Sequence, residues 1–264
     1  MANTNMHINN ILKNGFTLIK GVINRDECDN IKKISQDLYK KYKKKIKIKN
    51  PLEEAIYNLH NKDKIFLKYI DYDKTYKVVK KLLSTGAYAN NSDPIIRQTA
   101  IRNPIIGHAQ QLHNDTRIIG CKFPLIIQVI YMLDDFTKLN GATRIVPKSH
   151  LKDEYAKSNK KYNNEKIITG QKGDAIILDA SIWHGSAKKT IKNDRWGMIY
   201  SYCRWFLKAS FDHNKNTPIK FYKKLSLEQR KILGFNFNPP KDEFCRSSGR
   251  SKKPETPEKY NLPN

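Results

Sequence analysis

Two short fragments of the sequence carry side chains that bind transition metals. In QQLHND, residues 110–115, His113 and Asp115 are two residues apart at the end of an extended segment. Residues i and i+2 of a strand project from the same face, so an imidazole and a carboxylate can converge there on one ion. Such a pair also arises by chance, because a histidine or aspartate at a strand end is often a turn or surface residue.

The second fragment, GDAIILDASIWHGS at residues 173–186, predicts an apolar strand that ends at His184, about seventy residues after the first pair. A barrel can bring such distant strands together. Two imidazoles and one carboxylate on one face of an octahedral ion form the facial triad of Fe(II) oxygenases, which leaves positions for a bidentate 2-oxo acid and O2. The alternative is that His184 is a rim residue hydrogen-bonded to a loop.

Arg195 follows His184 by eleven residues and opens a further extended segment. A dicarboxylate that chelates iron through one end needs a cation at its other end, and a guanidinium can bind that carboxylate bidentately. Arg204 is the competing cation on this segment, and strand alternation puts the two arginines on opposite faces. Arg195 is favoured because it lies nearer the His184 turn. Its alternative role is an external salt bridge, for example with Asp194.

The elements that must position these residues change character near Pro94. Upstream, an extended segment at 15–23 precedes a helix that begins with Asn24 as its cap and runs to about Tyr42. Further helices are predicted at 52–60, 64–70 and 72–83. Downstream, β-branched extended segments are predicted at 95–101, 106–113, 125–133, 142–146, 174–180 and 197–205. This succession indicates an antiparallel barrel or jelly roll with the N-terminal helices packed outside.

The chain length predicts a single catalytic domain over residues 1–235, with its β core at about 94–207. A Lys- and Asn-rich insertion at 151–168 is expected to form a loop or helical lid on the substrate side of the barrel rim. Residues 236–264 are rich in Pro, Lys and Ser, and we expect them to form a flexible basic tail.

The formal net charge of +25 raises the question of an anionic partner such as nucleic acid. Most of this charge is lysine spread over predicted helix faces and loops, which favours a solvated basic surface. The sequence has no apolar run long enough to span a membrane, and its N-terminus lacks the layout of a signal peptide. We therefore expect a cytoplasmic protein with no membrane partner.

In their order along the chain, these fragments resemble the phytanoyl-CoA dioxygenase family of Fe(II)- and 2-oxoglutarate-dependent oxygenases. The matching pieces are GFTLIKGVI, QQLHND, QVIYMLDD, NGATRIVPKSH, GDAIILDASIWHGS and the strand at Arg195, and together they cover about residues 12–207. The resemblance implies a mainly β fold whose core is a double-stranded β-helix, the cupin-like jelly roll. It also implies iron bound by His113, Asp115 and His184, and 2-oxoglutarate bound by Arg195 with help from Ser186.

The resemblance does not settle the roles of two other residues, Gln128 and His150. Gln128 either faces the barrel interior, where it would contact the cosubstrate, or is an outward-facing surface amide. The turn at 147–150 has Lys148 where the family commonly has glycine, so a role for His150 near the substrate does not follow.

The resemblance implies hydroxylation of a small or medium-sized organic substrate, with O2 consumed and succinate and CO2 released. The basic composition favours an anionic substrate. Halogenating relatives replace the carboxylate at the position of Asp115 with a small residue, so Asp115 favours hydroxylation. Two other classes stay open: a basic nucleic-acid-binding or nucleobase-modifying jelly-roll protein, and a metal-binding jelly roll without catalysis. The sequence indicates neither the substrate nor the oligomeric state.

Overall fold

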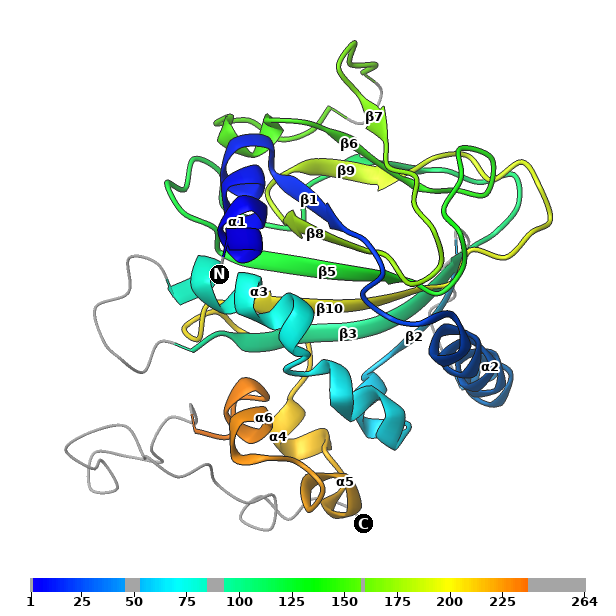
Figure 1. Cartoon of the computed structure of the whole chain (residues 1–264), viewed down its shortest axis with the longest axis vertical. Coiled ribbons are helices and arrows are strands. Elements are labelled where there is room, and N and C mark those ends of the chain that lie inside the picture. The colour runs from blue at the N-terminus through cyan, green and yellow to red at the C-terminus, as the bar shows by residue number, and fades with distance from the viewer. Residues whose placement is uncertain (1, 46–52, 85–92, 158–159, 237–264) are drawn as a thin grey trace.

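The computed structural model describes residues 2–45, 53–84, 93–157 and 160–236. Ten strands in these ranges form two antiparallel sheets, which face each other as two layers (Figure 1). The strands are β1 (Phe16–Ile19), β2 (Glu53–Tyr57), β3 (Ile95–Pro104), β4 (Gln110–His113), β5 (Ile126–Met132), β6 (Thr143–Val146), β7 (Lys166–Ile167), β8 (Ala175–Asp179), β9 (Trp183–Ser186) and β10 (Gly197–Cys203).

The larger sheet has the order β1-β8-β5-β10-β3-β2, and the smaller sheet has the order β4-β9-β6-β7. Neighbours in each sheet are far apart in the sequence, as expected for a jelly roll. Among the described residues no ladder of hydrogen bonds joins the two sheets into a closed barrel. The predicted fold class, a mainly β jelly-roll core with helices outside, is confirmed.

The central strands of the larger sheet are buried on both faces, since every residue of β5, β8 and β10 is buried. On β5, Gln128 and Ile130 face the space between the sheets, whereas Val129 and Tyr131 face the helices. The sequences of these strands are therefore almost entirely apolar, and Gln128 is a polar exception.

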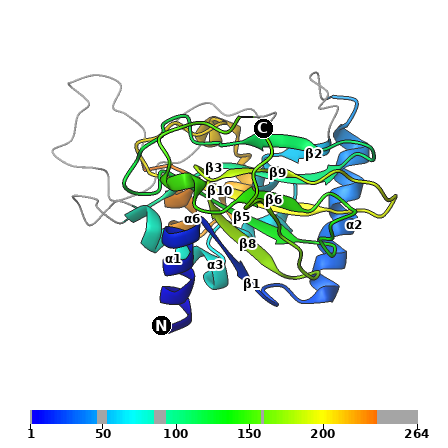
Figure 2. The same ribbon diagram turned by 90° about the horizontal axis from the view of Figure 1, so that it is seen from above.

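Three longer helices, α1 (Ala2–Asn14), α2 (Arg25–Tyr42) and α3 (Asp73–Ser84), precede the core strands. Helices α1 and α2 lie at opposite sides of the sheets (Figure 2). The N-cap prediction for α2 is confirmed, because Asn24 Oδ1 accepts a hydrogen bond from the Glu27 backbone N–H at 2.8 Å. The prediction for 72–83 matches α3, while α1 was not predicted.

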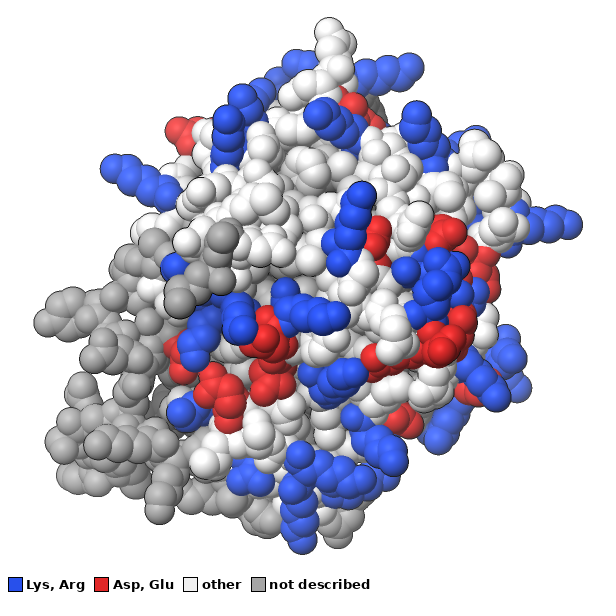
Figure 3. Space-filling model, in the orientation of Figure 1, with Lys and Arg blue, Asp and Glu red and all other residues white. Residues whose placement is uncertain are grey.

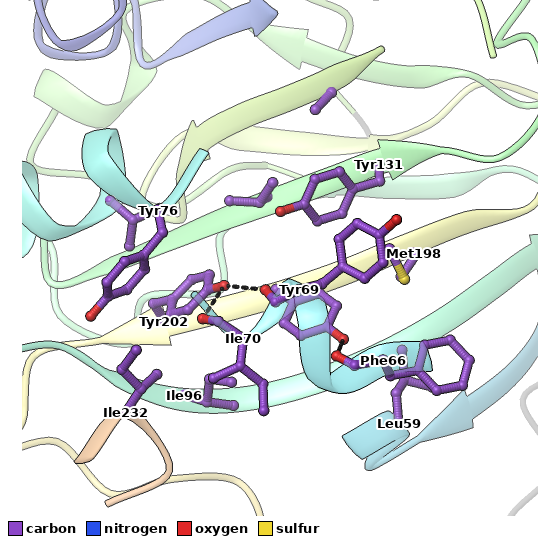
Figure 4. Packing of buried hydrophobic residues seen from close by; sticks show 14 of the residues in the cluster. Leu59, Phe66, Tyr69, Ile70, Tyr76, Ile96, Tyr131, Met198, Tyr202 and Ile232 are labelled. Atoms are coloured by element: carbon purple, nitrogen blue, oxygen red, sulfur yellow. Dashed lines mark hydrogen bonds between the residues drawn. The ribbon is translucent and has the colours of Figure 1, made fainter. Parts of the chain in front are cut away.

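Aromatic residues fill the outer face of the larger sheet, where α3 and the 3-10 helices η1 (Leu59–Asn61) and η2 (Lys64–Tyr69) pack (Figure 4). The hydroxyl group of Tyr202 donates to the backbone oxygens of Tyr69 and Ile70, each at 3.1 Å. A buried tyrosine can keep its ring in the core because its polar tip finds a partner. This packing fixes the sheet that forms one wall of the candidate site.

The helix predicted over 52–60 is wrong. Residues 53–57 form β2, an edge strand paired with β3, and only Leu59–Asn61 are helical, as η1. Pairing with an exposed strand edge satisfies the backbone of β2, and local helix propensity yields to that tertiary contact.

Two strand boundaries also differ from those predicted. Residues 106–109 form a turn and loop, so β4 begins only at Gln110. The fragment at 174–186 is two strands rather than one: β8 belongs to the larger sheet and β9 to the smaller one. The chain turns at 180–182, where Asp179 accepts the Ser181 backbone N–H.

Beyond β10 the chain forms short helices α4 (His213–Asn216), α5 (Ile219–Tyr222) and α6 (Leu227–Ile232), which the sequence reading missed. The insertion at 151–168 contains only the end of the 3-10 helix η3 (Ser149–Leu151) and the short strand β7 as regular elements among its described residues. Its role as a lid and the limits of the domain stay predictions, and the predicted tail lies outside the described residues from 237 onward.

No helix in the described part of the chain has the length and apolar character needed to cross a membrane. The cytoplasmic location stays a prediction.

Candidate metal centre

His113, Asp115 and His184 meet between the two sheets. One ligand atom from each lies within 4.8 Å of the others. The Nε2 atoms of His113 and His184 are each 3.6 Å from a different oxygen of Asp115. The two imidazole rings are 4.4 Å apart between centroids. No other group of three histidine, cysteine or acidic side chains in the described residues has this geometry.

The second nitrogen of each imidazole is held by the backbone. His113 Nδ1 lies 3.0 Å from the Gln111 carbonyl oxygen, and His184 Nδ1 lies 2.9 Å from the Ile182 carbonyl oxygen. A carbonyl oxygen can only accept, so Nδ1 carries the proton in each ring and Nε2 presents its lone pair. Both lone pairs are thus available on the side where Asp115 lies.

Strand pairing sets the distance between the histidines. His113 at the end of β4 is the register partner of His184 on β9, and Gln110 is the partner of Ser186. Gly185 allows this approach, because a Cβ there would lie 2.5 Å from the Gln110 backbone oxygen and 2.8 Å from that of Gln111.

Asp115 lies beyond the end of β4, so strand alternation does not place it. Its backbone N–H donates to the Ala180 oxygen at 2.9 Å, in the turn between β8 and β9. Gln128 Nε2 donates to its Oδ2. Burial opposes ionisation of Asp115, but His184, His113 and Arg102 outweigh it and hold the pKa of the carboxyl well below its usual value. The carboxylate is charged and oriented, as a metal ligand requires.

Burial and the neighbouring Asp115 shift the pKa values of the two histidines in opposite directions. Burial lowers the pKa of His113. For His184, burial acts in the same direction, but its hydrogen bond and attraction to Asp115 prevail and raise its pKa. Two nitrogen donors and one carboxylate that converge in this way fit a divalent first-row metal such as iron.

The same cavity that contains the triad is lined by Gln128, Ser186 and Arg195. Arg195 is buried, and its terminal nitrogen Nη2 donates to the Thr143 hydroxyl group at 3.0 Å. Its Nε has no hydrogen-bond partner among the described residues. The guanidinium group lies 3.8 Å from the centre of the Phe136 ring, and burial lowers its pKa to about 10. A charged group with an unused donor in a cavity fits the far carboxylate of a dicarboxylate.

The register of the larger sheet separates the triad from Arg195. Gln128, which contacts Asp115, pairs with Ser201 of β10, whereas Arg195 lies before Gly197 at the opposite end of that strand. Ile130 and Ile199 line the cavity between these ends. This arrangement suits an elongated ligand with one end at the triad and the other at Arg195.

The remaining predicted positions have mixed outcomes. Gln128 faces the interior and is buried, so it is not a surface amide, but the contact it makes is with Asp115. The Ser186 hydroxyl group accepts the Gln110 backbone N–H at 2.9 Å.

Arg204 donates to the Pro124 oxygen and is not among the residues that line this cavity. His150 lies 3.1 Å from the Leu12 oxygen, outside the cavity lining.

Several cavity residues were missed by the sequence reading. Thr143 is the partner of Arg195, and Arg102 with Glu53 forms an ion pair at 3.2 Å on the cavity wall. Asn103 accepts the Arg195 backbone N–H at 3.0 Å. The strand of Arg102 also contains Arg97 and Gln98, so its polar residues gave no signal specific to Arg102.

Residues 11–195 match the family model of phytanoyl-CoA dioxygenase. The chain belongs to the phytanoyl-CoA dioxygenase family. The match confirms the predicted family and its class, the non-haem Fe(II)- and 2-oxoglutarate-dependent dioxygenases. The predicted cofactors, iron and 2-oxoglutarate with O2, are those of this class.

Curated relatives include proteins with dioxygenase names. The dioxygenase trt7 of Aspergillus terreus is 32% identical over 136 residues, which are 48% of this chain and 46% of the relative. The multifunctional dioxygenase ausE of Penicillium brasilianum is 28% identical over 141 residues, 48% of this chain and 47% of the relative. The chain spans about half the length of the curated relatives it matches.

Among solved structures, HygX from Streptomyces hygroscopicus with nickel and 2-oxoglutarate bound superposes with a TM-score of 0.62 at 15% identity. The match covers 77% of this chain and 88% of HygX. The iron-bound structure of HygX gives a TM-score of 0.61 at 14% identity. At this identity the likeness supports the fold of this family member.

Proposed function

We propose that the chain is a dioxygenase that hydroxylates a small organic substrate. Fe(II) is held by His113, Asp115 and His184, and 2-oxoglutarate is anchored by Arg195. The observation that carries this proposal is one cavity in which three metal-ligating atoms lie within 4.8 Å and a buried guanidinium group keeps an unused donor.

When bound, iron with 2-oxoglutarate and O2 supplies the oxidising chemistry, with succinate and CO2 as products. The protein provides orientation. The backbone carbonyls at Gln111 and Ile182 accept from Nδ1 of each histidine, so the neutral ring would present Nε2 to the metal, and Gln128 donates to the Asp115 carboxylate. These contacts hold the three ligand atoms together, and a metal bound by them would have coordination positions left for the reactants.

At the opposite end of the cavity, Arg195 is held at three points. Asn103 accepts its backbone N–H, Thr143 accepts from its Nη2, and Phe136 stacks on its guanidinium group. The unused Nε can donate to the 5-carboxylate of 2-oxoglutarate. Ile130 and Ile199 limit the water between the two ends. Ser186 is proposed to assist through its hydroxyl group.

Two observations support hydroxylation of a small molecule. The carboxylate of Asp115 fills a ligand position that halogenating relatives leave free for chloride. HygX has been solved with nickel, 2-oxoglutarate and hygromycin B bound, and its fold is similar. We infer that this chain also acts on a small molecule.

The proposal is tested by succinate release from 2-oxoglutarate in the presence of Fe(II) and O2, measured with a panel of small metabolites. Asp115→Ala removes a ligand, so we expect it to reduce succinate release to the level without protein. Lys188→Ala, an exposed position close to β9 in the sequence, is the control and should retain the wild-type rate. Full activity of Asp115→Ala would contradict the ligand assignment.

A further inference from the structure

The cavity has a second guanidinium group, on a side chain that is 21% exposed, for which the cosubstrate gives no use. Arg102 lies on β3, beside Gly197 of β10 and Ala55 of β2. Its side chain faces the space between the sheets and lines the cavity together with the triad. In the described lining of this cavity, Arg102 and Arg195 are the two cationic residues other than histidine.

The two arginines are held by different parts of the fold. Arg195 is held from the smaller sheet by Thr143. Arg102 is held from the edge strand β2, where Glu53 lies 3.2 Å from its Nη1 and the Tyr57 ring centre lies 5.7 Å from its guanidinium carbon. The separate supports indicate separate ligands for the two cations.

Arg102 keeps hydrogen-bonding capacity beyond its ion pair with Glu53. A guanidinium group has five N–H donors arranged as a planar fork. Glu53 engages Nη1, whereas Nε has no partner among the described residues although it is buried. The Nε and Nη2 edge of an arginine matches the two oxygens of a carboxylate. A cation that lines a cavity and has a donor without a protein partner can bind a ligand that supplies acceptors.

The charges of the proposed complex balance without Arg102. Iron with Arg195 offsets Asp115 and the two carboxylates of 2-oxoglutarate, so Arg102 and Glu53 are left as a neutral pair. Gly197, the register partner of Arg102, has no side chain, and Phe136 lies 3.1 Å from where its Cβ would be. A ligand bound at Arg102 would therefore be the primary substrate rather than 2-oxoglutarate.

We propose that the Nε and Nη2 edge of Arg102 binds a carboxylate of the primary substrate, and that Glu53 holds the guanidinium group in position. This inference rests on the proposed function and names a substrate class for the same site: organic acids, whose carboxylate is bound at Arg102 while another carbon lies near the metal.

The test is calorimetric titration of protein loaded with Ni(II) and 2-oxoglutarate, since nickel prevents turnover and binding alone is measured. The probes are benzoate, phenylacetate and hexanoate, each beside its primary amide. We expect at least one carboxylate to bind at least tenfold more tightly than its amide. Arg102→Gln should weaken binding of that carboxylate at least tenfold. Glu53→Gln should tighten it, because the amide oxygen can still accept from Arg102 and hold it in position while the competing negative charge is removed.

Arg117→Gln is the matched control, because it removes the same charge from an exposed position outside the cavity lining. It should change carboxylate affinity less than twofold. Arg102→Lys keeps the positive charge but lacks the planar set of N–H donors. We expect its affinity for the carboxylate to lie between those of the wild type and Arg102→Gln. This variant also serves if Arg102→Gln does not fold.

Three results would overturn the inference. In the first, Arg102→Gln weakens the binding of 2-oxoglutarate as much as Arg195→Gln does, which would assign Arg102 to the cosubstrate. In the second, each carboxylate and its amide bind the wild type with equal affinity. In the third, no carboxylate binds the wild type. Failure of the wild type to bind Ni(II) and 2-oxoglutarate is a different outcome, because it would contradict the proposed function itself.

Discussion

Gly185 separates His184 from Ser186 and allows β9 to lie close to β4. Substitution by alanine would place a Cβ 2.5 Å from a backbone oxygen, which cannot move like a side chain. We expect Gly185→Ala to displace His184 from His113 and to weaken metal binding by roughly 10- to 100-fold, the range seen when the support of a ligand is lost. Competition with a chelator measures this affinity, and an unchanged value would contradict the proposed role of the β4–β9 register.

Thr143 supports Arg195 through a single hydrogen bond at 3.0 Å. Thr143→Val keeps the shape of the side chain and removes the acceptor, so Arg195 becomes less well oriented. We expect KM for 2-oxoglutarate to rise roughly 10-fold, since hydrogen bonds to charged groups contribute about 1.5–3 kcal/mol. An effect on kcat with no change in KM would argue against this role.

The sequence motifs predicted the three triad residues and Arg195, because their types and order match a family pattern. Thr143, Arg102 and Glu53 were not predicted as cavity residues. Their places depend on the register of paired strands: Arg102 faces Gly197 across one pair and Ala55 across another. A single sequence does not specify which residues of distant strands become neighbours.

At the scale of elements, the prediction was better for α2 and α3 than for β2. The apolar positions of α2 recur at helical spacing, and a capping residue marks its start. The short β2 has no comparable local signal, and its conformation depends on the free edge of β3. The division of residues 174–186 into β8 and β9 was not predicted for a related reason. The two strands follow each other closely in the sequence, and they differ in the sheet to which each belongs.

The helical segment after β10 packs on the core partly through two buried histidines. His60 of η1 and His213 of α4 have ring centroids 4.9 Å apart. Burial lowers the pKa of His213 to about 4 and that of His60 well below its usual value. Protonation of either ring in the folded protein therefore requires a pH far below the ordinary range for histidine.

This burial predicts a pH-dependent stability. Between about pH 6.5 and 4 the unfolded chain binds protons that folded His213 excludes, so stability falls as the pH falls through this window. A shift to about 4 corresponds to roughly 3 kcal/mol for His213 alone. Urea unfolding at several pH values between 7.5 and 4 measures the effect, with His213→Gln as the comparison. Equal slopes for wild type and variant would contradict it.

At the level of the whole molecule, the formal net charge is +25. On the face in Figure 3, lysine and arginine side chains are scattered over many elements and are interleaved with acidic residues. Such a surface supports non-specific attraction of polyanions more than a defined nucleic-acid site.

We expect binding to DNA or RNA oligonucleotides to be weak and to fall steeply between 50 and 200 mM salt, since it arises from counterion release. Fluorescence anisotropy with single- and double-stranded probes measures it. Tight binding that survives 200 mM salt and is unaffected by His184→Ala would favour the nucleic-acid-binding alternative.

The central claim is that one cavity binds iron and 2-oxoglutarate together. The most direct measurement is anaerobic titration of the metal-free protein with Fe(II) and 2-oxoglutarate, followed by the visible charge-transfer band of the chelate. We expect a band in the wild type, loss of the band in His184→Ala, and a weakened affinity for 2-oxoglutarate in Arg195→Gln. Absence of the band in wild-type protein that has bound iron would contradict it.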